Sequence, residues 1–349
     1  TSNASSSTAS SATGSGSGPN WLGLLKWSLS YSDGTSSSSS VHPMSPEDKI
    51  WLETVMKECV KDEGQRLCEI LKEFMTMIEN GTVYDVEQED KIFELLEETQ
   101  LMIDQIDMAN VFVKFGGIKV LKCLLSTTPQ QATEEAATAA VGGPTTSDPI
   151  KCLSCVLIGE LAQNNPSVQD QMFQNGVIDE LCLICLTNST SSKLCVKALY
   201  GLSCVIRGHR NSELRFFHEL NGPIFLHRLL QRNDSSCTSK ILFLLGALIS
   251  SDFASLEMVA TYGDLLFEEC YRFLQLKTHE LECQATLQFF SSLTHSANAR
   301  RYLDQHQGRI LSALEEKYKM IQQEKKESSG EEDYATELDL ITGITETIK

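Results

Sequence analysis

Two pairs of cysteines have the residue type and spacing of a metal site. Cys152 and Cys155 form one Cys-x-x-Cys pair, and Cys182 and Cys185 form another further along the chain. Two such pairs can supply the four thiolates of a tetrahedral Zn²⁺ site. Both pairs, however, lie in stretches with the apolar spacing of helices, where cysteine commonly packs as a small hydrophobe. The sequence therefore favours core cysteines, with no metal and no cofactor.

The other residues with catalytic chemistry form no known constellation. The seven histidines include no His-Glu-x-x-His pair, and the chain has no Walker loop, dinucleotide-binding glycine fingerprint or nucleophile elbow. Asp and Glu are numerous, but their spacing is typical of solvated helix faces. We therefore expect a protein that is not an enzyme.

The charge balance and the apolar runs restrict the partners. The chain has 47 acidic and 29 basic residues, for a formal net charge of −18. Phosphate backbones repel such a chain, so we expect no nucleic-acid binding. No apolar run approaches the roughly 18 residues of a membrane span, and no secretory signal pattern is visible. The twelve cysteines, scattered among apolar residues, indicate reduced thiols in a cytosolic or nuclear compartment, and together with the missing signal pattern we expect a cytoplasmic location.

The first part of the chain, residues 1–44, is rich in Ser and Gly. Such a composition buries too little apolar surface to offset the entropy of ordering, so we expect disorder. An apolar island at 21–29, which includes Leu24, Leu25 and Trp27, interrupts it. A docking segment has this pattern, and so does a first helix packed on the end of the fold. Both alternatives stay open from the residues alone.

Helical signals dominate the remainder of the chain. Ser45, Pro46 and two acidic residues open a helix, because Ser caps, Pro suits the first position and acids suit the positive end of the dipole. Apolar residues with helical spacing continue through residues 45–106, which we expect to form capping helices. No alternating β pattern occurs, so the predicted fold class is all-α.

A repeat covers residues 107–320. Small-x-aliphatic triplets recur with a period of roughly 40–47 residues, and their aliphatic members are Leu161, Val205, Leu248 and Leu293. After each triplet comes a glycine followed by another apolar helix, and these glycines are Gly176, Gly222, Gly263 and Gly308. Each unit is therefore predicted to be a helix, a turn, a short helix, a glycine turn and a third helix.

This period indicates an armadillo-like, right-handed superhelical array with helical caps and a disordered N-terminus. A degenerate first copy ends at Gly116-Gly117, and a low-complexity insert, residues 126–148, separates it from the next copy. Residues 321–349 are expected to be a charged tail or capping helix.

Polar residues at equivalent places in the repeats are the candidate binding residues. Asn164 and Arg207 both follow the first helix of a repeat; helix-end and turn chemistry is the alternative explanation for both. Arg228, Glu268 and Arg272 lie on third helices, which line the concave surface of a solenoid, where partners usually bind.

Several segments, taken in order, resemble the armadillo-type nucleotide exchange factors of the 70-kilodalton heat-shock chaperone. They are Leu157–Asn165, Val196–Arg207, Phe216–Gly222, Ile106–Asn110 (where Met108 replaces the usual Asn) and Leu24–Leu29. The last segment is similar to one found in cytosolic members of the family.

The resemblance implies a co-chaperone mechanism. Family members enclose one lobe of the chaperone's nucleotide-binding domain, open its cleft, release ADP and so promote client release. The resemblance also implies that Asn164 and Arg207 contact the partner and that residues 21–29 mimic a client peptide. We expect a monomer that binds the chaperone. The alternative is an armadillo-type scaffold that binds another protein or an extended peptide in its concave groove.

Overall fold

The computed structural model describes residues 45–59, 63–80, 84–126, 146–187, 190–278, 280–327 and 334–349. The chain divides into two units, Thr1–Glu63 and Gly64–Lys349. The first unit contributes one described helix, α2 (Pro46–Cys59), whose first turn carries Glu47 and Asp48. Ser45 caps it by accepting a hydrogen bond from the Asp48 backbone N–H at 3.0 Å. The predicted segment Leu24, Leu25 and Trp27 and most of the insert 126–148 lie outside the described residues.

The second unit is a stack of helical repeats, which confirms the predicted all-α repeat fold. The part of the chain that the structure describes contains no strand. The first helices of the repeats are α4 (Val86–Met102), α7 (Asp148–Ala162), α10 (Ser192–Ile206), α13 (Ser235–Ile249) and α15 (Leu281–Thr294). Short second helices follow in three repeats: α5 (Ile106–Lys114), α8 (Pro166–Gln174) and α11 (Arg210–His218). The separate third helices of the same repeats are α6 (Gly117–Leu125), α9 (Val177–Leu186) and α12 (Gly222–Leu230).

The last two repeats contain one long helix in place of the second and third helices. These helices are α14 (Leu256–Leu274) and α16 (Ala297–Glu327), and both run unbroken through the glycines that the sequence analysis assigned to turns. The prediction of turns at Gly263 and Gly308 is therefore wrong. Gly263 is needed for a different reason, because a Cβ there would lie 2.3 Å from the Tyr302 ring. Gly308 would meet nothing within 4 Å.

In the earlier repeats a left-handed residue does separate the second and third helices. Gly116 has φ +97° and Gly176 has φ +67°, conformations that glycine adopts without the clash of a Cβ. In the third repeat this position is Asn221, with φ +50°. The prediction of the turn at Gly222 is thus off by one residue, and Gly222 instead begins α12 against the Phe216 ring.

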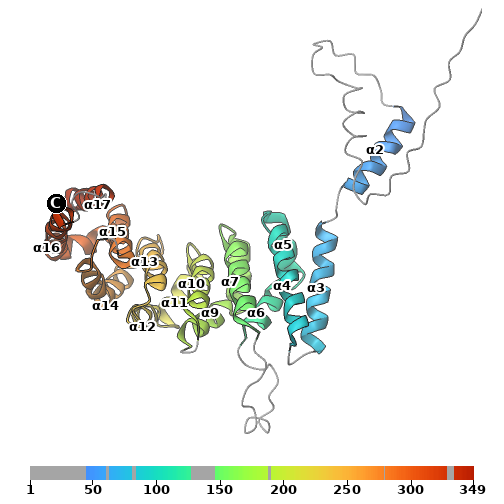
Figure 1. The fold of residues 1–349 in the computed structure, drawn as a ribbon, viewed down its shortest axis with the longest axis horizontal. Helices are drawn as coiled ribbons and strands as arrows, with labels where there is room; N and C mark the ends of the chain where they lie inside the picture. The colour runs from blue at the N-terminus through green and yellow to red at the C-terminus, as the bar shows by residue number, and fades with distance from the viewer. Residues whose placement is uncertain are drawn as a thin grey trace, which may run out of the picture. The chain divides into compact units, whose positions relative to one another are not determined.

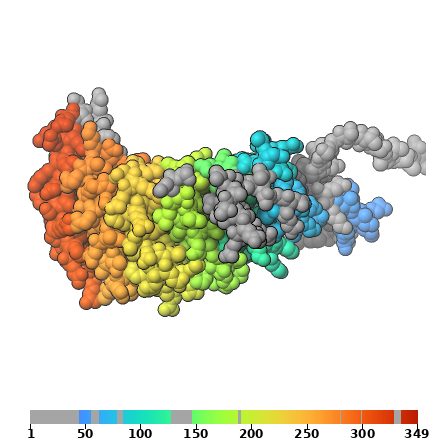
Figure 2. Space-filling model, turned by 90° about the horizontal axis from the view of Figure 1, so that it is seen from below, coloured from blue at the N-terminus to red at the C-terminus, as the bar shows by residue number. Residues whose placement is uncertain are grey.

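The repeats associate through two rows of helices (Figure 1). First helices contact first helices along the series α4, α7, α10, α13 and α15, and third helices contact third helices along α6, α9, α12, α14 and α16. Figure 2 shows the repeats as successive bands of colour in chain order. Because each band contacts its neighbours, a continuous core runs along the stack.

Close crossings in the first-helix row depend on small residues. A Cβ on Gly201 of α10 would lie 2.8 Å from the Cys155 carbonyl oxygen of α7. A Cβ on Gly159 would lie 2.3 Å from the Tyr200 ring. These two glycines let α7 and α10 approach until backbone and ring atoms touch.

Helices at the two ends complete this unit. Helix α3 (Glu63–Asn80) buries Leu67, Ile70 and Phe74, and its Arg66 makes two 2.7 Å hydrogen bonds with the Glu98 carboxylate of α4. Helix α17 (Ala335–Ile348) packs on α15 and α16, in the place that the first helix of a further repeat would take. It buries Ile341, Ile344 and Ile348.

Candidate functional site

The third-helix row carries exposed apolar side chains, which is unusual for a helix whose other apolar residues are buried. Leu183 and Leu186 of α9 are 49% and 36% exposed, and Ile224 of α12 is 47% exposed. They lie beside the buried residues of α9 and α12, on the solvent-facing side of each helix. We call Leu183, Leu186, Ile224 and Arg228 the third-helix face.

Arg228 adds a cation to this face. It lies one helical turn after Ile224, so the two side chains are on the same side of α12. Arg228 is exposed, and among the described residues no carboxylate pairs with it. An apolar side chain beside an available guanidinium is a combination that protein interfaces favour.

Further along the row, Arg309 of α16 binds Glu268 of α14 through two parallel hydrogen bonds. Its Nη1 and Nη2 lie 2.5 Å and 2.7 Å from Oε1 and Oε2, and its guanidinium carbon lies 4.3 Å from the centre of the Tyr271 ring. The hydrogen bonds to Arg309 lower the pKa of Glu268. Glu268 is therefore already paired with a residue of the same protein. This pair joins two different repeats and was not predicted from the sequence.

Arg272 is also paired, in this case on its own helix. Its Nε donates to Glu269 at 2.8 Å, and its guanidinium lies 4.7 Å from the Phe273 ring centre. His227 of α12 lies 3.8 Å from the same Glu269 carboxylate. Arg228, Glu268 and Arg272 thus lie on one helix row. Glu268 and Arg272 each pair with a side chain of opposite charge. Among the described residues, no carboxylate pairs with Arg228.

Asn164 and Arg207 lie elsewhere. Asn164 is exposed and left-handed, with φ +55°, in the turn between α7 and α8. Arg207 is the C-cap of α10, and its guanidinium stacks on Phe243 of α13 at 4.7 Å from the ring centre. The structure therefore separates the five predicted partner-binding residues into a third-helix group and a pair at the ends of first helices.

Asn110 has a structural contact that connects two repeats. Its Oδ1 accepts a hydrogen bond from Asn165 Nδ2 at 3.3 Å, and Asn165 in turn caps α8. Asp107, from the same family-like segment, is exposed on the first turn of α5.

The two Cys-x-x-Cys pairs lie within α7 and α9, and all four thiols are buried. Burial raises the pKa of Cys182 to about 12, and burial also raises the pKa of Cys152 and Cys155. A protonated, buried thiol is a poor metal ligand and a poor nucleophile. Over the described ranges, no group of three or more His, Cys, Asp or Glu side chains has the geometry of a metal site.

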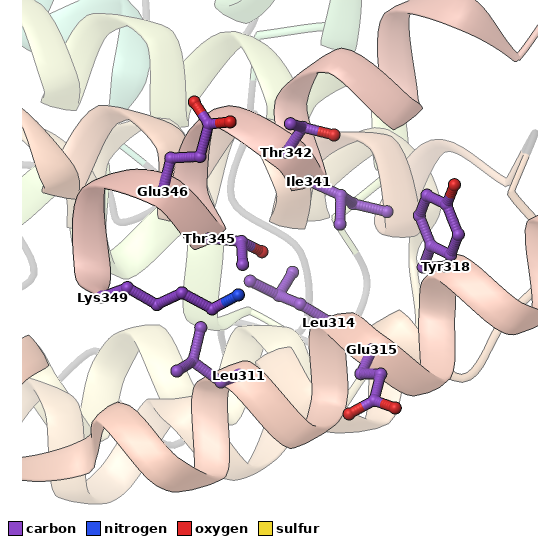
Figure 3. Close-up of a pocket in the computed structure, with 9 residues that line it drawn as sticks. All are labelled: Leu311, Leu314, Glu315, Tyr318, Ile341, Thr342, Thr345, Glu346 and Lys349. Carbon is purple, nitrogen blue, oxygen red and sulfur yellow. The ribbon is translucent and has the colours of Figure 1, made fainter.

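A pocket of about 360 Å³ lies between α16 and α17 (Figure 3). Leu311, Leu314 and Ile341 provide its apolar surface, and the Lys349 side chain extends toward the two leucines. The pocket lies at the end of the stack, on helices that carry none of the residues of the third-helix face.

Comparison with known proteins identifies the class. A designed armadillo repeat protein superposes with a TM-score of 0.53 at 11% sequence identity, covering 81% of this chain and all of the designed one. An engineered protein from a structural genomics consortium gives a TM-score of 0.55 at 14% identity, covering 93% of this chain and 67% of its own. At these identities the likeness shows the fold alone, which is that of armadillo repeat proteins.

The family model "Nucleotide exchange factor Fes1" matches residues 22–112. This match confirms the resemblance inferred from the sequence, and it extends from the apolar island to α5. No curated protein matches the chain in sequence. Among the described residues, no helix is both long and apolar enough to cross a bilayer.

Proposed function

We propose that this chain is a nucleotide exchange factor that binds the nucleotide-binding domain of the 70-kilodalton heat-shock chaperone, promotes ADP release and thereby client release. The match of residues 22–112 to the exchange-factor family carries the proposal. The repeat stack supports it, because a long row of third helices offers a surface large enough to hold a protein lobe. We further propose that the protein acts in the cytoplasm as a monomer.

The third-helix face is the surface we assign to the chaperone. Leu183, Leu186 and Ile224 supply apolar area, and Arg228 supplies a cation. The Arg309–Glu268 pair joins α14 to α16 and holds the far part of this row in place. Asn164 and Arg207 lie outside this surface, so the proposal does not use them.

Thermodynamics limits what such a surface can do. The factor accelerates ADP release only if it binds the open, nucleotide-poor state of the chaperone more tightly than the closed state. Each tenfold difference between the two affinities corresponds to about 1.4 kcal/mol. In this proposal, the contacts made only with the open lobe come from side chains on the third-helix face.

The test is release of a fluorescent ADP analogue from the preloaded chaperone. We expect addition of this protein to accelerate release, and an unchanged rate would overturn the proposal. If a different protein is instead bound and the chaperone is not, the general scaffold function applies.

Substitution of Ile224 tests the surface. Ile224→Asp places a charge in the apolar part of the third-helix face, so we expect about a tenfold or greater loss of exchange activity. The matched control is Leu281→Asp, because Leu281 is 54% exposed at the start of α15, a first helix. Equal activities of the two variants would show that the chaperone binds elsewhere.

A further inference from the structure

A groove on the first-helix row has no part in the proposed exchange function. It has a volume of about 340 Å³ and lies across α13 and α15, with Arg207 from the end of α10 at its edge. First helices form one row of the stack and third helices form the other. The groove is therefore separate from the third-helix face.

Small residues make the surface hollow here. Gly246, Ala247 and Ala285 line the groove where α13 and α15 pack together. A Cβ on Gly246 would lie 3.2 Å from Ser292 Oγ and 3.4 Å from the Phe289 ring, so even alanine at that position would require the Ser292 side chain to shift slightly. Phe243 forms one wall and is 57% exposed, on a helix whose other large apolar residues are buried. An exposed aromatic wall beside a small-residue floor leaves space for a side chain from another molecule.

Arg207 gives the groove its charge. Its guanidinium stacks on the Phe243 ring, which fixes the plane of the cation, and its Nε makes one long hydrogen bond of 3.3 Å to the Ser203 carbonyl. Among the described residues, no carboxylate lines the groove. By contrast, carboxylates pair with five other arginines of the described residues, namely Arg66, Arg215, Arg272, Arg300 and Arg309. Half of the ten arginines therefore pair with no carboxylate among the described residues, and Arg207 is one of these.

A second cation lies near Arg207. Lys240 and Arg207 both lower the pKa of the Cys204 thiol, against the larger effect of burial, which raises it. The groove shares Ser250 and Ser292 with a second hollow that is lined by Asp252 and His295. Two cations near one groove favour an acidic side chain in the molecule that it binds.

We infer that this groove binds a short, extended segment of a partner protein that carries an acidic residue and, two positions further on, an apolar residue. The acidic side chain pairs with the Arg207 guanidinium, whose planar, stacked geometry suits a carboxylate. The apolar side chain lies on the same side of the extended segment and packs between Phe243 and the floor at Ala247 and Ala285. The groove reaches from Arg207 at the end of α10 across α13 to α15, and two helix spacings of about 8–10 Å are crossed by about six extended residues at ~3.3 Å each.

The direct test is the binding of a fluorescein-labelled hexapeptide in which one glutamate and one leucine are two positions apart and the other residues are serine, measured by fluorescence anisotropy with the full chain. The control peptide has lysine in place of glutamate. We expect the acidic peptide to bind at least about tenfold more tightly than the basic one. Equal binding of both peptides, or no binding of the acidic one, would overturn the inference.

Two variants locate the binding. Arg207→Glu should weaken binding of the acidic peptide by about tenfold or more and strengthen binding of the basic peptide. Unfolding of the variant cannot produce such an exchange of preference. Ala247→Trp should fill the groove and abolish binding of the acidic peptide, while its circular dichroism and thermal midpoint stay close to those of the parent. If either variant binds the acidic peptide as the parent does, the site is not this groove.

The inference and the exchange function can fail independently. Ala247→Trp alters only the first-helix row, so we expect ADP release from the chaperone to be unchanged in this variant. Ile224→Asp should give the reverse result, with peptide binding kept and exchange lost. A variant that loses both activities would contradict the separation of the two surfaces.

Discussion

Gln169 and Glu213 occupy equivalent positions on two successive second helices and connect the repeats in opposite ways. Gln169 Nε2 donates to the Cys204 and Arg207 carbonyls at the end of α10, both at 2.9 Å. Glu213 accepts from the Gly208 N–H at 2.8 Å and from the Ser251 hydroxyl, which follows α13, at 2.5 Å. One residue is a donor to the next repeat and the other an acceptor, and both side chains are buried.

Exchanging these two side chains should have opposite effects on stability. Gln169→Glu replaces a donor with an anion that faces two carbonyl oxygens, so we expect a loss of about 1–3 kcal/mol or more in the free energy of unfolding. Glu213→Gln removes a buried charge and keeps an acceptor, so we expect a higher thermal midpoint at pH 7. Urea unfolding of both variants against the parent measures the two changes.

The pH dependence of Glu213 follows from its burial. Burial raises the pKa of this carboxyl above its ordinary value of 4.5, although the Ser251 and Gly208 hydrogen bonds oppose the rise. A carboxyl with a raised pKa stabilises the fold when protonated, and this contribution is lost as the pH rises from its ordinary pKa through the raised one. The free energy of unfolding of Glu213→Gln, relative to that of the parent, should therefore increase from pH 4 to pH 7. A difference in stability that stays constant with pH would show that the pKa of Glu213 is the same in the folded and unfolded states.

At the residue scale, the sequence predicts helix faces better than partners. The position of Arg228 on an exposed helix face follows from the period of apolar residues in α12. The pairing of Glu268 with Arg309 does not, because the two residues lie in different repeats and meet only after α14 and α16 pack. The exposed Leu183 and Ile224 could have been noticed as apolar residues at otherwise polar positions of the third helices.

At the element scale, glycine has three separate roles in this stack, and a repeat pattern alone does not distinguish them. Gly176 provides a left-handed turn, Gly201 provides space for a crossing backbone, and Gly308 lies in an exposed helix with no neighbour within 4 Å. The repeat period was predicted correctly, but the turns at Gly263 and Gly308 were not. The repeat period depends on which residues face the core. A helix that continues through the glycine position keeps the same residues facing the core, so the period does not reveal whether a turn occurs there.

Alanine substitution separates two of these roles. Gly201→Ala places a Cβ 2.8 Å from the Cys155 carbonyl oxygen, so α10 must move away from α7, at a cost of about 1–3 kcal/mol. Gly308→Ala meets no atom and improves helix propensity, for a gain of about 1 kcal/mol. Chemical denaturation of the two variants provides the comparison. Similar changes in both variants would mean that the close crossing of α7 and α10 does not limit stability.

At the scale of the whole molecule, the proposed function has one part that depends on the N-terminal region. We propose that Leu24, Leu25 and Trp27 mimic a client peptide and act on the chaperone separately from the repeat stack. Deletion of residues 1–44 should then leave ADP release unchanged and slow the release of a fluorescent peptide from the chaperone. The two release assays, run on one preparation, give the comparison. Equal loss in both assays would show that the segment supports the fold.

The repeats also differ in how they can bend. In the first three, a single left-handed residue divides the second helix from the third, whereas α14 and α16 cross the same position as continuous helices. A continuous hydrogen-bonded helix resists bending far more than two helices joined at one residue. The C-terminal repeats are thus the stiffer part of the stack, and the repeats that carry Leu183 and Ile224 are the more compliant part. When a partner binds, we expect the chain to bend mainly at the more compliant repeats. Adjustment to the partner's shape then occurs at α9 and α12, the helices that carry the exposed apolar side chains.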